Sequence, residues 1–226
     1  MRVFDKVRFK KLRLWIFWPY CIVFIFCPPT RGLYLQYGIP LIVLGLVIRL
    51  WASGYIEKSR KLAICGPYAF VRNPLYVGNF LLVAGFTFLA YNPFLLSYYI
   101  GAFWFLYYFT IKKEEGVLLE KFGNEFRQYK KEVPAFIFRL TPYLLAEKKK
   151  FNFSLSVKNG EWIRIYGVLI LLAMIYFRDE FAIAKHPVGA RHVVLMAITL
   201  ILIAGVLWNI RIRRALDRKE AHASHS

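Results

Sequence analysis

The apolar residues of this chain fall into long blocks rather than alternating along it. We interpret six blocks of 14 to 22 residues as membrane spans, the first being the shortest, because a helix needs about 20 residues to cross a hydrocarbon core about 30 Å thick. The six blocks are Leu14 to Cys27, Leu33 to Gly54, Leu75 to Tyr91, Phe94 to Ile111, Trp162 to Phe177 and His192 to Ile210. Since 58% of the 226 residues are hydrophobic, an ordinary soluble domain is excluded. The sequence predicts an all-α, polytopic membrane helix bundle of about six spans.

Basic residues surround the blocks and give the chain a formal net charge of +19. They do not form one soluble face, so a membrane surface with anionic head groups is a better partner for them than nucleic acid. Lys and Arg gather in residues 1–13, 49–74, 112–158 and 211–219. By the positive-inside rule, both termini and the two long connections are cytoplasmic. The basic start resembles a signal peptide, but Pro19 and Cys27-Pro28-Pro29 replace a small-residue cleavage site, which favours a retained span.

Two neighbouring spans form a predicted hairpin that brings charges together. The first span leaves after Arg72-Asn73, the chain turns at Asn92-Pro93, and the second span returns to Glu114-Glu115. At 1.5 Å per residue the two arms are similar in length, so the arginine and the acids are expected at the same end. Pro67 and Pro74 make the stretch before the hairpin a stiffened segment rather than a helical extension.

The residues after the acidic pair predict a cytoplasmic interfacial helix. Apolar residues from Glu115 to Tyr129 follow helical spacing with Lys and Arg between them, and the helix is expected to end before Val133-Pro134. Such a helix would cover a pocket at the lipid boundary.

Residues 51–134 resemble the integral-membrane methyltransferases that include isoprenylcysteine carboxyl methyltransferase and the phospholipid methyltransferases. The resemblance rests on two motif halves in matching order and spacing. They are Gly66-Pro67-Tyr68, Arg72-Asn73-Pro74, Tyr76 and Gly78, followed by Glu114-Glu115, Leu118, Phe122-Gly123, Tyr129 and Val133-Pro134. Either half alone is a weak signal, whereas both together are fairly specific.

The resemblance implies S-adenosylmethionine as methyl donor and a lipid-like or prenylated acceptor that enters from the bilayer. It also implies that Arg72 and Glu115 are catalytic, and that the acids meet the donor's ammonium, its ribose hydroxyls or Arg72. The donor would be bound by Tyr68, Arg72, Asn73, Pro74, Tyr76, Glu114, Glu115 and Leu118.

Asn73 stands where the isoprenylcysteine and phospholipid enzymes usually have His. The four histidines, His186, His192, His222 and His225, lie near the outer face or in the tail, so no core histidine is available as a cytoplasmic general base. Methyl transfer from a sulfonium mainly needs alignment and a desolvated site. A carboxylate or thiolate acceptor is therefore weakly favoured over an amine, whose proton would have to pass to a glutamate or a tyrosine.

Two other functions stay open from the sequence. A membrane sterol or lipid reductase would use NADPH, whose extra phosphate suits the basic loop 112–158. A non-catalytic membrane protein would use Gly45, Gly85, Gly101 and Gly167 as helix-packing sites, a role they can also have in an enzyme.

The chain divides into three expected parts. These are a methyltransferase-like core of residues 1–145, a basic linker of residues 146–160, and an additional two-span hairpin with a basic tail in residues 161–226. Cys21, Cys27 and Cys65 have no CxxC spacing, so neither a disulfide framework nor a metal site is expected.

Overall fold

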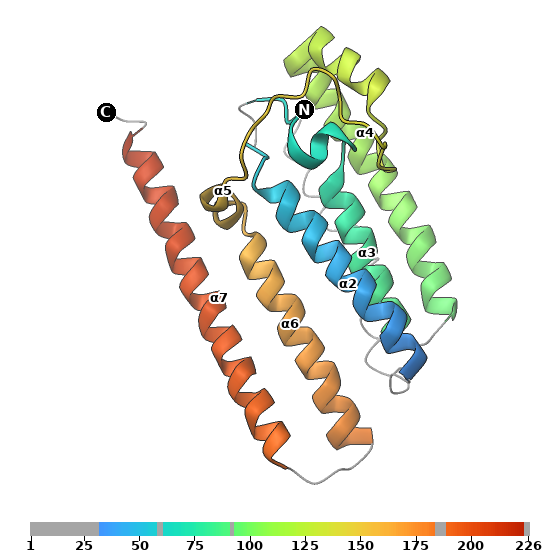
Figure 1. Cartoon of the computed structure of the whole chain (residues 1–226), viewed down its shortest axis with the longest axis vertical. Coiled ribbons are helices and arrows are strands. Elements are labelled where there is room, and N and C mark those ends of the chain that lie inside the picture. The colour runs from blue at the N-terminus through green and yellow to red at the C-terminus, as the bar shows by residue number, and fades with distance from the viewer. Residues whose placement is uncertain (1–31, 58–60, 91–92, 184–188, 224–226) are drawn as a thin grey trace. The chain divides into compact units, whose positions relative to one another are not determined.

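The computed structural model describes residues 32–57, 61–90, 93–183 and 189–223. All regular secondary structure in these ranges is helical, which confirms the predicted all-α class (Figure 1). The elements are α2 (Gly32–Ser53), the 3₁₀-helix η1 (Gly66–Ala69), α3 (Pro74–Leu89), α4 (Pro93–Glu132), α5 (Phe153–Lys158), α6 (Glu161–Phe177), the π-helix η2 (Arg178–Ile183) and α7 (Ala190–Ala223).

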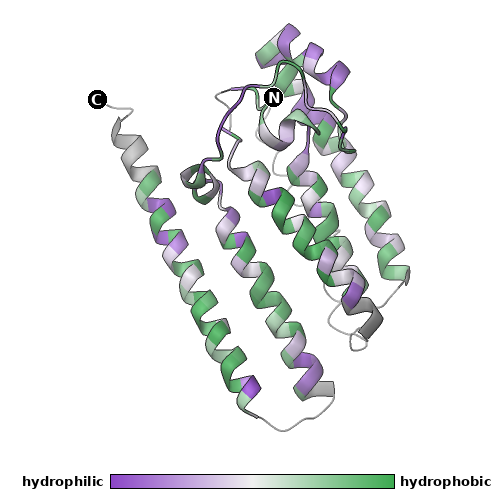
Figure 2. Ribbon diagram, viewed as in Figure 1, coloured by the Kyte–Doolittle hydropathy of each residue, from purple (hydrophilic) through white to green (hydrophobic). Residues whose placement is uncertain are grey.

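Three of the described helices are long and apolar enough to cross a membrane. The segments are Gln36–Ser53 in α2, Phe94–Glu132 in α4 and Ala190–Leu216 in α7, while α3 is a shorter apolar helix. Figure 2 shows hydrophobic residues along most of α6 and α7 and hydrophilic residues toward the end of α4. The predicted span Leu14 to Cys27 and the turn residue Asn92 lie outside the described residues. The chain is thus an integral membrane protein, and the prediction of six spans stays a prediction.

The chain forms two compact units, described here one at a time. The first comprises Met1–Val47 and Val71–Arg139, and the second comprises Ile48–Phe70 and Leu140–Ser226. The expected division at residues 145 and 160 stays a prediction. The stretch 146–160, expected to be a linker, contains the short helix α5, which Asn152 caps by accepting a hydrogen bond from the Leu155 N–H at 3.0 Å.

In the first unit, small residues let α2 and α3 approach closely. A methyl group on Gly38 would lie 2.9 Å from the Gly85 carbonyl oxygen, and one on Gly85 would lie 2.7 Å from the Gly38 carbonyl oxygen. One on Gly45 would meet the Gly78 carbonyl oxygen at 2.8 Å. The packing role expected for Gly45 and Gly85 is confirmed.

The same role for Gly101 and Gly167 finds no support in the described residues. Among the described residues, nothing lies within 4 Å of a methyl group placed on either one. Their spacing within apolar helices does not distinguish a helix contact from a face that is open to lipid.

Aromatic rings hold α3 against α4. Phe80 of α3 contacts Tyr99 and Phe103 of α4 with ring centroids 5.9 and 4.9 Å apart, and the Tyr99 hydroxyl donates to the Phe80 carbonyl at 3.2 Å. Phe136, beyond the end of α4, packs on the same rings. This packing makes α3 and α4 the antiparallel hairpin that the sequence predicted, with residues 74 and 114 at one end.

The structure corrects the start of the expected interfacial helix. The helix does not break between the span that begins at Phe94 and residue 115, because α4 is continuous from Pro93. It first leaves helical geometry at Gly123, where φ is 51° and ψ is −119°. This left-handed conformation strains any residue with a Cβ, so Gly123 sets the place of the kink. The second half then ends at Glu132, directly before Val133, as predicted.

The second unit joins the end of α2 to the C-terminal helices. The Asn159 side-chain amide donates to the carbonyl oxygens of Ser53 and Ile56 at 2.9 and 3.0 Å. These carbonyls belong to the last turn of α2 and the residues after it, where a helix leaves acceptors without partners. The α6–α7 hairpin, with α5 at one end of it, is therefore tied to the end of α2 (Figure 1).

Candidate functional site

An ion pair joins the two predicted motif halves inside the first unit. The Arg72 Nη2 lies 3.1 Å from Glu115 Oε1, and the two side chains are only 11% and 15% exposed. Lys130 Nζ lies 2.6 Å from the other oxygen of Glu115. Two cations from different parts of the chain thus share one carboxylate at the end of the α3–α4 hairpin. Because this carboxylate is largely shielded from water, the electrostatic attraction within the pair is stronger than in an exposed ion pair.

The second glutamate is held separately. The Tyr76 hydroxyl, in the first turn of α3, donates to Glu114 Oε1 at 2.6 Å. The Tyr76 ring contacts Tyr107 of α4 edge to face, with centroids 4.7 Å apart. The Tyr107 hydroxyl in turn accepts from the Asn79 side-chain amide at 3.1 Å. Each of the neighbouring acids is therefore oriented by its own partner from the other motif half.

The residues after α4 fix the backbone of the Arg72-Asn73 segment. The Arg72 N–H donates to the Pro134 carbonyl at 2.9 Å, and the Asn73 side-chain amide donates to the Ala135 carbonyl at 3.0 Å. Pro74 then occupies the first position of α3, where its missing N–H costs no hydrogen bond. Asn73 therefore holds this loop in place through its NH₂ group, which acts as a donor and is too weakly basic to take up a proton.

Arg72 has one donor to spare. Its Nε atom is buried and has no hydrogen-bond partner among the described residues, while Nη2 is used by Glu115. A buried donor without a partner costs free energy, so this position favours an incoming acceptor such as a carboxylate oxygen. The acids beside it suit an ammonium or hydroxyl groups. The residues thus fit a ligand that carries both a carboxylate and an ammonium group.

The other predicted residues are placed as follows. Pro74 begins α3 and Leu118 lies on α4 one turn after Glu114, so both are on the elements that carry the ion pair. Tyr68 is buried in η1, which belongs to the second unit. The structure thus brings together Arg72, Asn73, Tyr76, Glu114 and Glu115. Their roles in a reaction are taken up under the proposed function.

The sequence did not predict the part that Lys130, Pro134 and Ala135 take in the site. Lys130 looked like one of many basic residues on an amphipathic helix, and the two carbonyls have no side-chain signal. The Val133-Pro134 dipeptide could have indicated this contact, since the proline ends the helix at the point where the Arg72 N–H finds its backbone acceptor. Tyr107 and Asn79 were also missed, although Asn79 follows Tyr76 by one helical turn.

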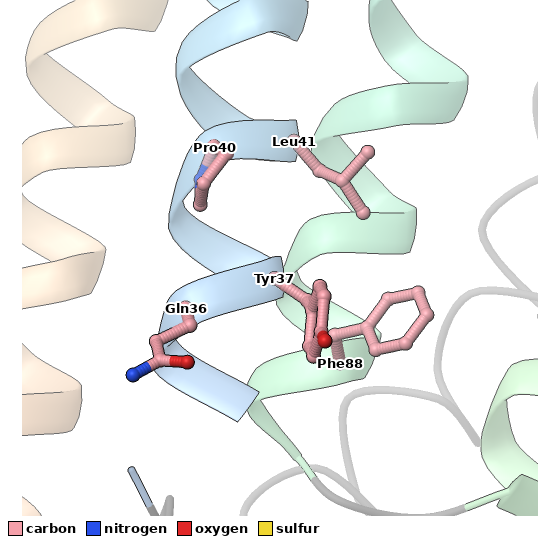
Figure 3. A pocket seen from close by; sticks show the side chains of 5 residues that line it. All are labelled: Gln36, Tyr37, Pro40, Leu41 and Phe88. Carbon is pink, nitrogen blue, oxygen red and sulfur yellow. The ribbon is translucent and has the colours of Figure 1, made fainter. Parts of the chain in front are cut away.

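A pocket of about 470 Å³ lies elsewhere in the first unit. Figure 3 shows its lining, which consists of Gln36, Tyr37, Pro40 and Leu41 from α2 and Phe88 from α3. Phe88 is 14 residues beyond Pro74 on α3, or about 21 Å along the helix. The pocket is therefore at the far end of α3 from the acids, and its nearly all-apolar lining does not suit a charged ligand.

The described residues include neither a metal-binding cluster nor a reactive cysteine. No group of three or more His, Cys, Asp or Glu side chains in them could hold a metal ion. Cys65 is a buried free cysteine of the second unit, and loss of hydration on burial raises the pKa of its thiol. A thiol that stays protonated is a poor nucleophile, so Cys65 is not placed in the chemistry of the site.

Residues 34–125 match the family model described as phospholipid methyltransferase. This range includes α3 and α4 as far as Glu125, and with them Arg72, Tyr76, Glu114 and Glu115. The resemblance expected from the two motif halves is therefore confirmed over this segment.

Named relatives are similar to part of the chain. The nickel-cobalt-cadmium resistance protein NccN of Alcaligenes xylosoxydans xylosoxydans is 35% identical over 102 residues, covering 44% of this chain and 47% of that protein. The cobalt-zinc-cadmium resistance protein CzcN of Cupriavidus metallidurans is 34% identical over 113 residues, covering 49% and 52%. The protein-S-isoprenylcysteine O-methyltransferase of Xenopus laevis is 38% identical over 78 residues, covering 34% and 27%.

These similarities are partial. The chain spans about half the length of the first two relatives, with 47% and 52% of their sequences covered. No solved structure matches the chain.

Proposed function

We propose that this chain, whose residues 34–125 match the phospholipid methyltransferase family, is an integral-membrane methyltransferase that uses S-adenosylmethionine. The observation that carries the proposal is the Arg72–Glu115 ion pair, which joins the two motif halves across the α3–α4 hairpin at 3.1 Å. Its side chains are mostly buried but polar, which is what a charged donor needs at the boundary of an apolar bundle. The relatives named as isoprenylcysteine O-methyltransferases support the same reaction class.

Binding of the donor would use the charges of this site. The spare Nε donor of Arg72 suits the carboxylate of the donor's amino-acid part. Glu114 and Glu115 suit its ammonium group and ribose hydroxyls, and Tyr76 keeps Glu114 oriented for this task. Tyr68, Asn73, Pro74 and Leu118 complete the proposed set, with Asn73 acting through the loop that it anchors to Ala135.

The bound donor supplies a methyl group on a positively charged sulfur, which makes the methyl carbon electrophilic. The chain's own residues have to align the acceptor with that carbon and keep water out. Arg72 and Lys130 together balance the charges of Glu114 and Glu115, so these side chains can give a rigid polar wall without a net charge. No strong base is required when the acceptor arrives as a carboxylate or a thiolate.

The acceptor in this proposal is a membrane-resident, lipid-like or prenylated molecule. The site lies where the apolar part of α4 gives way to its charged second half, so apolar walls meet one end of an amphiphile and charges meet the other. Carboxylate or thiol acceptors rank above amines, because the side-chain amide of Asn73 is too weakly basic to take up a proton. By the positive-inside rule, the site opens to the cytoplasm.

Titration calorimetry of the purified chain in detergent tests donor binding. We expect saturable binding of S-adenosylmethionine and of its demethylated product, and weak or no binding of NADPH. Arg72→Ala should lose binding, whereas Arg127→Ala, which removes the same charge from the exposed second half of α4, should keep it. Binding of NADPH without either sulfur compound would replace this proposal with a membrane reductase.

A further inference from the structure

A buried ion pair in the second unit links α2 to the C-terminal hairpin. Arg49 donates to both oxygens of Glu161, with Nε at 2.7 Å from Oε1 and Nη2 at 2.9 Å from Oε2. The two residues are 3% and 1% exposed. Arg164 Nη1 also donates to Glu161, at 2.6 Å. One buried carboxylate is therefore already shared by two guanidinium groups.

A third arginine approaches the same place from α7. The Arg213 guanidinium lies against Gly160, since a methyl group on Gly160 would be 2.8 Å from Arg213 Nη1. Gly160 has a φ of 75°, which favours glycine, and the absent side chain leaves the room that Arg213 occupies. Among the residues whose side chains the structure describes, none forms an ion pair with Arg213. Glu161 is paired with Arg49 and Arg164, and Arg213 lies beside them at Gly160, so this cluster of three arginines and one glutamate has two positive charges in excess.

The two outer arginines are open to an approaching ligand. The Arg164 side chain is 46% exposed, and Arg213 is exposed as well. A guanidinium has five N–H donors in a fork that matches a phosphate group, and only Nη1 of Arg164 is used by Glu161. The buried Arg49–Glu161 pair joins α2 to α6 and fixes the carboxylate that Arg164 contacts. The cluster has the charge and the donors of an anion site.

We propose that Arg164 and Arg213 bind the phosphate group of an anionic membrane lipid. A lipid is favoured over a free phosphate ion because the part of α7 that precedes Arg213 is a long apolar helix, in which Leu207 and Trp208 are 57% and 64% exposed. Trp208 is five residues before Arg213, or about 7.5 Å along the helix. An acyl chain can lie beside this apolar helix while its head group meets the guanidinium groups. The site is separate from the proposed methyl transfer and does not depend on it.

Native mass spectrometry of the intact chain with defined lipids tests the proposal. We expect at least one phosphatidylglycerol molecule to bind about tenfold more tightly than phosphatidylcholine, which is the order expected for two nearby arginines. Arg164→Gln together with Arg213→Gln should abolish this preference. Arg211→Gln together with Arg214→Gln removes the same charge from exposed positions on the same turns of α7 and should retain it.

Two further measurements separate this site from other sources of affinity. Millimolar inorganic phosphate or glycerol phosphate should compete poorly with the lipid, and equal competition by either would show a site for the free ion instead. Replacing both arginines by lysine keeps the charge and should keep part of the preference, provided that the circular dichroism spectrum shows a folded chain. The proposal is overturned if the Arg164 and Arg213 pair of substitutions leaves the lipid preference unchanged. It is also overturned if the Arg211 and Arg214 control loses the preference to the same extent.

Discussion

The hydroxyl group of Tyr76 donates a hydrogen bond of 2.6 Å to Glu114, so the first turn of α3 fixes an acid that lies 38 residues further along the chain. Glu115, the next residue, is bound instead by Arg72 and Lys130. Two adjacent carboxylates therefore have different partners, one a neutral hydroxyl and the other a pair of cations. In the proposed enzyme this difference separates their tasks.

Tyr76→Phe is predicted to reduce methyl transfer about tenfold, since a hydrogen bond to a charged group contributes about 1.5 to 3 kcal/mol. The ring contact with Tyr107 is retained in this variant, so the change isolates the hydroxyl group. Tyr108→Phe, at an exposed position of α4, is the matched control and should leave transfer unchanged. Initial rates with labelled donor measure both. Full activity of Tyr76→Phe would remove the Glu114 contact from the mechanism.

Arg72→Ala and Glu115→Ala are each predicted to lower methyl transfer at least about tenfold, because each breaks a charge-assisted contact. Since the two side chains touch, the double variant should lose less than the product of the single losses. Glu120→Ala and Arg127→Ala, on exposed positions of α4, serve as charge-matched controls. Unchanged transfer in a folded variant that lacks both Glu114 and Glu115 would exclude the acidic pair from the site.

Gly123→Ala is predicted to destabilise the chain by about 1 to 2 kcal/mol, the cost of placing a Cβ in left-handed backbone. Nothing lies within 4 Å of the added methyl group among the described residues, so the effect is one of conformation and not of packing. Gly116→Ala, in regular helix with equally open surroundings, should instead stabilise by up to about 1 kcal/mol. Thermal unfolding in detergent distinguishes the two. A raised midpoint for both variants would show that α4 runs straight through residue 123.

Glu161→Gln is predicted to destabilise the second unit by about 3 to 5 kcal/mol, because Arg49 would be left as a buried charge without its carboxylate. Glu147→Gln breaks the exposed pair with Lys149 and should change stability by less than about 1 kcal/mol. Chemical unfolding followed by tryptophan fluorescence gives both values. Equal stability of the two variants would mean that Arg49 and Glu161 do not hold α2 to α6.

The positions of the helices could be predicted from the sequence because membrane spans require long apolar blocks. The predicted blocks from Leu75 and from Trp162 agree with α3 and α6 to within about two residues, the usual uncertainty of a helix end. The start of the interfacial helix could not be predicted in this way. Its amphipathic pattern begins near Glu115, but the backbone bends only at Gly123, since hydrophobic periodicity reports the faces of a helix and not its direction.

The site could be predicted in part. Hairpin geometry and the motifs together indicated that Arg72 and Glu115 would meet, which the ion pair confirms. The contacts of Arg72 and Asn73 with the carbonyls of Pro134 and Ala135 could not be foreseen, because a backbone acceptor about 60 residues away has no side-chain signature. The Arg49–Glu161 pair was also missed, since each residue alone resembles an ordinary charge at the end of a span.

Transfer of a labelled methyl group into lipid is the most direct test of the proposed function. The purified chain is reconstituted in vesicles of a total lipid extract and given S-adenosylmethionine labelled in its methyl group, beside a Glu115→Ala sample. A parallel reaction receives the pool of water-soluble metabolites instead of the extract. The account predicts label in the organic phase with the unaltered chain and at least about tenfold less with the variant. Label that appears only in water-soluble products would contradict it.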